Sequence, residues 1–296
     1  MKAGAAIAAL EQYGTAFWPA SRLTATAAAM VALTWTAAAQ AGPQTVASSL
    51  APHRAVYNMS LASTKLSGGV TGANGQMTYK FSDSCDGWTV ENRTLLTFSY
   101  NDGAPVATTW DFVTWESKDG LNYRFRVRST RDGEVSEEID GTARLDPQTH
   151  AGQVKFTLPE PKTLPLPKGT LFPTEHTIRI LELAQKGDRL INRTLFDGTG
   201  LDGASAVTAA IGSQFPANSN PGPVSDNPAV NATLLSAPSW RMQMAFFNQG
   251  GDGTPDYEVG LRYYLNGVAD EVMQSFGNFT LKGTLQSLEP LPKPDC

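Results

Sequence analysis

Few residues in this sequence combine the types and the spacing that catalysis requires. His53, His150 and His176 are the only histidines, and none lies in a serine or cysteine context typical of a nucleophile. The sequence also lacks Gly-x-Ser-x-Gly, His-Glu-x-x-His and phosphate-binding glycine motifs. A carboxylate pair acting in acid–base catalysis stays an alternative that no motif supports. We therefore expect no catalytic residue and no cofactor, and we assign His176 to helix capping or packing.

One segment rich in glycine and acidic residues has a weak likeness to a calcium-binding loop. Asp252, Asp256 and Glu258 alternate along it. The segment lacks the further early ligand and the distant glutamate of an EF-hand. We expect a plain hairpin turn here and no metal site.

The clearest binding chemistry is a row of arginines. Arg124, Arg126 and Arg128 alternate with apolar residues over 121–128, and this period of two is typical of a half-buried strand. Guanidinium groups bind carboxylates and phosphates. On the concave side of a curved sheet the row would form a site for an anionic ligand, so it is our candidate ligand-binding site. The alternative is a solvated face whose arginines pair with acids of the next strand.

The sequence after the arginine row supports that pairing. Asp132-Gly133-Glu134 is typical of a three-residue hairpin loop with its glycine in the left-handed conformation. Such a loop fixes the register of the two strands, and both charge and hydrophobicity agree with it. The opposed pairs are Arg126 with Asp140, Arg128 with Glu138 and Val127 with Ile139.

The same alternation recurs along most of the chain. Gly, Asn, Asp and Pro separate the alternating segments at the spacing of an antiparallel meander, not of βαβ units. So many strands need closure or overlap to protect their edges, which predicts an all-β, mainly antiparallel barrel or strongly curved sheet. Strands are predicted at 54–65, 75–81, 88–100, 106–116, 121–128, 152–158, 189–197, 203–211, 239–247, 257–265, 268–276 and 278–288.

One amphipathic helix interrupts the strands near residues 174–187. Thr174 is the predicted N-cap after Pro173, and Gly187 ends the helix. The wide apolar face of this helix must be covered, so we expect the helix across or inside the open end of the curved sheet.

Length, composition and charge limit the class of protein. The 296 residues are 41% hydrophobic and 17% charged, and the mean hydropathy of -0.24 excludes a polytopic membrane protein. The net charge of -5 gives no basic excess for binding nucleic acid.

The first forty residues have the pattern of an export signal. Arg22 precedes an apolar run over 23–39, which ends in Ala39-Gln40-Ala41. We predict a signal peptide at 1–41, with a retained N-terminal anchor as the alternative. The mature chain, 42–296, should then be a single exported domain without a transmembrane span and with a flexible Pro-rich loop at about 213–239.

Cys85 and Cys296 are the only cysteines. Their spacing fits no zinc motif, and one disulfide is the simplest interpretation in an exported chain. Two unrelated thiols are the alternative.

Several stretches together resemble a known family. Ala51-Pro52-His53-Arg54-Ala55-Val56-Tyr57 is similar to the start of the mature EipB proteins of alphaproteobacteria, which are periplasmic proteins of cell-envelope integrity. Further matching stretches are Cys85-Asp86-Gly87-Trp88, 171–176 and 257–270, and the likeness extends over 51–296. The resemblance implies a spiral-like open β-barrel in the periplasm, a disulfide between Cys85 and Cys296, and no catalytic residue.

Two classes of function follow from these observations. The first is a non-catalytic periplasmic protein that supports envelope integrity by binding a protein partner or a lipidic or anionic ligand in its curved sheet. The second is a periplasmic hydrolase that acts on an envelope component.

Overall fold

A single, mainly antiparallel sheet accounts for almost all of the regular structure. The computed structural model describes residues 45–65, 69–219, 227–248 and 253–296, and the predicted signal peptide lies outside them. The helices are α1 (Val46–Ser49), α2 (Pro173–Lys186) and the short 3-10 helix η3 (Ala232–Leu235). The strands are β1 (His53–Thr64), β2 (Val70–Asp83), β3 (Gly87–Tyr100), β4 (Val106–Ser117), β5 (Asn122–Arg131), β6 (Glu134–Leu145), β7 (Gly152–Leu158), β8 (Lys162–Leu166), β9 (Thr170–Leu171), β10 (Leu190–Leu195), β11 (Ser205–Phe215), β12 (Ser239–Phe247), β13 (Tyr257–Tyr264), β14 (Ala269–Ser275) and β15 (Phe279–Pro290).

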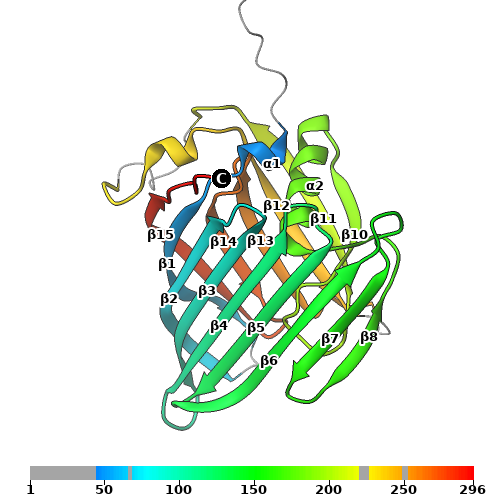
Figure 1. Ribbon diagram of the computed structural model, residues 1–296. Helices are drawn as coiled ribbons and strands as arrows, with labels where there is room; N and C mark the ends of the chain where they lie inside the picture. Colours follow the sequence, from blue (N-terminus) through cyan, green and yellow to red (C-terminus); the bar gives the residue numbers. More distant parts are fainter. Residues whose placement is uncertain (1–44, 66–68, 220–226, 249–252) are drawn as a thin grey trace, which may run out of the picture. The chain divides into compact units, whose positions relative to one another are not determined.

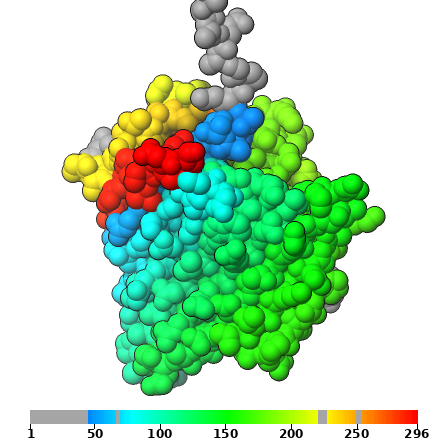
Figure 2. All heavy atoms as spheres, in the orientation of Figure 1, coloured from blue at the N-terminus to red at the C-terminus, as the bar shows by residue number. Residues whose placement is uncertain are grey.

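The strands curl into a nearly closed barrel (Figure 1). The sheet runs from β8 back to β1, continues through β15, and runs back from there to β9. Its two edges, β8 and β9, are consecutive in the chain, and the Lys162 Nζ of β8 donates a hydrogen bond of 3.2 Å to the Leu201 carbonyl across the seam. Strands β2 to β8 form the continuous outer wall that faces the viewer in Figure 2. The predicted all-β, antiparallel barrel is therefore confirmed.

The strands missing from the prediction lie at the edges of this sheet. β8 contains Pro165, which cannot donate a ladder hydrogen bond and is tolerated only at an edge. β9 has only two residues and pairs in parallel with β10. A strand this short shows no alternation of apolar and polar residues from which it could be predicted.

Helix α2 lies at one end of the barrel beside α1 (Figure 1). Its buried residues Ile178, Ile180 and Leu181 belong to the same apolar cluster as Trp88 and Trp240 of the sheet. The expectation that the sheet covers the apolar face of this helix is confirmed. Among the described residues, no helix has the length and apolar character needed to cross a membrane.

The Pro-rich segment is more ordered at its ends than predicted. β11 extends to Phe215, and Val230 forms a bridge to Leu288 of β15. Leu234 and Leu235 of η3 are buried. The loop boundaries of 213–239 are thus too wide, because apolar residues at both ends bury against the sheet; residues 220–226 lie outside the described part.

A disulfide joins Cys85, in the turn between β2 and β3, to Cys296, with 5.8 Å between their Cα atoms. The predicted pairing is confirmed, and the two-thiol alternative is wrong.

Replacing Cys85 with serine should lower the free energy of unfolding by about 2 kcal/mol and leave the fold intact. The chain-entropy estimate for a very long loop is about 5 kcal/mol, and measured values usually fall below such estimates. Urea denaturation of the variant and of the wild type, each with and without reductant, measures the loss. Reductant should bring the wild type to the level of the variant. A reduced wild type that is as stable as the oxidised protein would contradict the prediction.

Candidate functional site

The N-terminus of α2 is held by a carboxylate from the sheet. Glu116 on β4 accepts hydrogen bonds from the backbone amides of Thr174 (2.6 Å) and Glu175 (2.8 Å). Phe172 occupies the N-cap position and makes no side-chain cap hydrogen bond. The prediction of Thr174 as N-cap is wrong, because Pro173 already begins the helix and Glu116 satisfies the free amides.

A cavity of about 250 Å³ lies beneath this end of α2, inside the barrel. Burial raises the pKa of Glu116 to about 7, although the two amide hydrogen bonds act in the opposite direction. Burial, with a smaller effect of the nearby Arg193, lowers the pKa of His176 to about 4, so this side chain is neutral. The aromatic lining residues of the cavity are Tyr79, Phe81, Trp110, Phe112, Phe246, Tyr257 and Tyr263.

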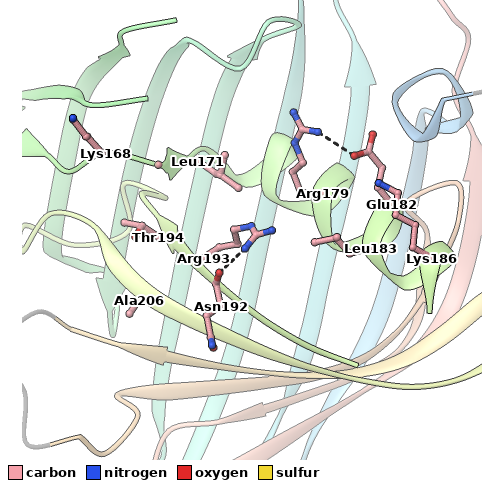
Figure 3. A pocket seen from close by; sticks show the side chains of 11 residues that line it. Lys168, Leu171, Arg179, Glu182, Leu183, Lys186, Asn192, Arg193, Thr194 and Ala206 are labelled. Atoms are coloured by element: carbon pink, nitrogen blue, oxygen red, sulfur yellow. Dashed lines mark hydrogen bonds and ion pairs between the residues drawn. The ribbon is translucent and has the colours of Figure 1, made fainter. Parts of the chain in front are cut away.

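A larger groove, of about 710 Å³, lies on the other flank of α2 (Figure 3). Leu183 of α2 and Leu171 of β9 supply its apolar surface. Lys168 lies at one side of the groove, and Arg193 of β10 lies near its centre beside Asn192. The segments that line it are 168–171, 179–186 and 192–194, with Ala206.

The groove has an excess of positive charge. Within the described residues, Lys168, Lys186 and Arg193 have no carboxylate within ion-pair distance. Arg179 differs from them, because it pairs with Glu175 (2.7 Å) and Glu182 (3.1 Å) along the helix. Cations beside an apolar floor are suited to an anionic ligand that also has an apolar part.

The predicted arginine row lies on the opposite side of the sheet from the barrel core. Tyr123, Phe125 and Val127 are buried in the core, whereas Arg124, Arg126 and Arg128 are exposed. The concave placement is therefore wrong for the row, since the intervening residues take the inward positions. Two of the arginines have acidic partners: Arg126 lies 2.8 Å from Asp140, and Arg128 lies 3.0 Å from Glu138.

The predicted register of this hairpin is confirmed, but through a different turn. Asp132 and Gly133 both have positive φ and form a two-residue turn. A register shift between Ser129 and Thr130 then supplies the extra residue. Arg126 therefore opposes Asp140, as a three-residue loop would also require.

The other singled-out residues have structural roles. His53 is buried, and its Nδ1 lies 2.7 Å from the Ala51 carbonyl. Asp256 accepts a hydrogen bond from the Asn248 amide, while Asp252 lies outside the described residues. In the part of the chain that the structure describes, no three His, Cys, Asp or Glu residues are placed to hold a metal ion.

Comparison with known proteins decides the family. Residues 44–292 match the family described as EipB-like. This chain belongs to the EipB-like family. A relative, the cell envelope integrity protein EipB of Brucella abortus (strain 2308), is 29% identical over 272 residues, which cover 90% of this chain and 94% of the relative.

A solved structure agrees with this assignment. The crystal structure of a beta-barrel-like protein of a domain of unknown function from Brucella abortus superposes with a TM-score of 0.75 and 28% identity. The match covers 82% of this chain and 99% of that protein. The EipB-like barrel is therefore shared between the two proteins.

Sequence reasoning missed the groove and Glu116 in this EipB-like chain. The groove joins three segments that are separate in sequence, so no local pattern marks it. Glu116 could have been found from the sequence, because it lies an even number of residues from Trp110 and Phe112 and so points to the same, inward face of β4. A carboxylate at an inward position needs a partner, and here the partner is a helix N-terminus.

Proposed function

We propose that this EipB-like protein supports the integrity of the cell envelope from the periplasm, as a non-catalytic binding protein. Its ligand is an anionic lipid-like molecule held in the groove between α2 and β10. The observation that carries the proposal is the set of unpaired cations Lys168, Lys186 and Arg193 around the apolar Leu171 and Leu183.

The proposal draws on two further observations and on one prediction from the sequence. The Brucella relative is named for envelope integrity. The chain as a whole is acidic, with a net charge of -5. A cluster of cations without acidic partners therefore differs from the rest of the protein, and it would attract an anionic ligand. The predicted signal peptide supplies the route to the periplasm.

Neutralising the groove should weaken ligand binding at least tenfold. The variant carries Lys168→Gln, Lys186→Gln and Arg193→Gln, which remove the charges and keep the hydrogen-bonding capacity of the side chains. The probe is a dansyl-labelled long-chain fatty acid, and its Kd is measured by fluorescence titration of the purified protein. Cells that carry the variant should also lose resistance to deoxycholate.

The matched control removes the same number of charges elsewhere. Arg54, Arg126 and Arg128 are exposed or partly exposed cations that each pair with an acid, and changing all three to glutamine should leave the Kd unchanged. Equal binding by the groove variant and the wild type would overturn the assignment of the groove. Hydrolysis of an envelope component by the pure protein would favour the hydrolase alternative.

A further inference from the structure

The outer face of the sheet carries a second set of cations that, unlike Arg126 and Arg128, form no ion pair with the acids of the neighbouring strand. Trp115 of β4 opposes Arg124 of β5, Arg124 opposes Thr142 of β6, and Thr142 opposes Lys155 of β7. Because neighbouring strands lie about 4.8 Å apart, these four side chains form a row about 14 Å long. Arg144 flanks the row, and a shallow pocket of about 370 Å³ lies over it.

The indole of Trp115 is fixed in position at one end of this row. A Cβ at Gly87 of β3 would lie 2.4 Å from its Nε1, so only glycine leaves room for the ring against that strand. On β5, the guanidinium carbon of Arg124 lies 4.9 Å from the ring centroid. This contact pre-orders both an aromatic surface and a cation.

In the described part of the chain, the cations of the row have no acidic partner, whereas the neighbouring Arg126 and Arg128 each pair with an acid. Arg124, Arg144 and Lys155 are exposed, and within the described residues none of them forms an ion pair. No carboxylate lines the pocket. Asp119 lies outside it; the Ser117 hydroxyl is the main cause of its lowered pKa, and Arg144 adds a small effect.

We propose that this row, which we call the Trp115 row, binds an anionic saccharide chain. The stacked Arg124 guanidinium and the exposed part of the Trp115 indole together contact the C–H face of a sugar ring, and the guanidinium and ammonium groups bind carboxylates along the chain. The Thr142 hydroxyl and the amide side chains of Asn122 and Gln153 lie in the same pocket and bond to sugar hydroxyls. A lone phosphate would make no contact with the Trp115 ring, and a neutral glycan would form no ion pairs with the cations of the row.

This inference concerns strands β4 to β7 and does not depend on the groove at α2. The two sites share no lining residue. The groove variant should therefore bind the saccharide normally, and failure of either proposal leaves the other standing.

The test is calorimetric titration of the full chain with a hexamer of galacturonate at an ionic strength of about 0.15 M. Trp115→Ala should weaken this binding at least tenfold, and Arg124→Gln and Lys155→Gln should each weaken it several-fold. The control is Arg126→Gln on the same strand and face, whose charge is already matched by Asp140, and it should bind like the wild type. Thermal unfolding of each variant shows whether it is folded.

Two further probes separate charge from sugar recognition. Maltohexaose has the rings without the carboxylates and should bind at least tenfold more weakly than the galacturonate hexamer. Inorganic tripolyphosphate has the charge without the rings, and its binding should respond to Lys155→Gln but not to Trp115→Ala. Tight binding of tripolyphosphate, or unchanged galacturonate binding by both Trp115→Ala and Lys155→Gln, would overturn the proposal.

Discussion

Replacing Asp270 with alanine should lower the free energy of unfolding by about 3–5 kcal/mol. Arg262 and Asp270 form an ion pair whose side chains are 1% and 0% exposed. The Arg262 Nε donates to Asp270 at 2.8 Å, its Nη2 donates to the second carboxylate oxygen, and the Tyr264 hydroxyl adds a hydrogen bond of 2.9 Å. Without the carboxylate, the guanidinium would be a buried charge with no compensation. Its Nη1 already has no hydrogen-bond partner among the described residues.

The neighbouring pair of Arg241 and Glu271 provides the control. These residues have similar bidentate geometry, at 2.9 and 2.8 Å, but their side chains are 55% and 41% exposed. Glu271→Ala should therefore cost less than about 1 kcal/mol. Urea denaturation of both variants measures the difference, which rests mainly on burial and in smaller part on the Tyr264 hydrogen bond to Asp270. Equal losses would show that solvent reaches Arg262.

A double variant tests the cause of the loss. Arg262→Met combined with Asp270→Leu removes both charges and keeps an apolar filling, so it should recover most of the stability that Asp270→Ala loses. If the double variant is as unstable as the single one, the loss comes from packing rather than from the unpaired charge.

The sequence predicted best where one face of a strand is buried. Val127 and Ile139 must both point inward, and that requirement set the register of β5 and β6 correctly even though the turn was of another type. A one-residue slip would have moved every apolar side chain of the hairpin to the solvent face. The alternation of apolar residues therefore predicts the register of the hairpin correctly whether the unpaired residue lies in the turn or in a β-bulge.

The same alternation could not tell which outward residues would be covered. Arg262 lies between the inward-facing Leu261 and Tyr263, so the alternation predicts that it points outward, yet it is only 1% exposed. Leu234 and Leu235 in the segment predicted as an exposed loop are buried, which shows that this segment covers part of the sheet. Burial of an outward residue depends on where a distant segment lies, and a pattern with a period of two does not contain that information.

Glu116 and His176 should give the stability of the protein two opposing dependences on pH. The pKa of Glu116 is about 7 in the folded protein against an ordinary 4.5, so the folded state keeps a proton that the unfolded state has lost. Its contribution is fully present below pH 4.5 and is lost as the pH rises to 7. The pKa of His176 is about 4 against 6.5, so its contribution is present above pH 6.5 and is lost as the pH falls to 4.

Removing either side chain should therefore change how the free energy of unfolding depends on pH, in opposite directions for the two variants. Glu116→Gln keeps one acceptor for the α2 amides, and its free energy of unfolding relative to that of the wild type should rise by roughly 3 kcal/mol between pH 4.5 and 7, because the variant lacks the loss that Glu116 causes over this range. The free energy of unfolding of His176→Gln relative to that of the wild type should fall by a similar amount between pH 4 and 6.5, because this variant lacks the gain that His176 causes over that range.

Urea denaturation at intervals across this range measures all three proteins, and the slope of the wild-type profile should lie between the slopes of the two variants, because the effects of Glu116 and His176 oppose each other. The sign of each slope is the decisive observation, since a loss of packing would lower stability equally at every pH. Parallel profiles for the two variants would contradict the burial of these groups beneath α2. Opposite slopes would show that the Glu116 carboxyl of β4 and the His176 imidazole of α2 are both uncharged in the folded protein and lie away from water.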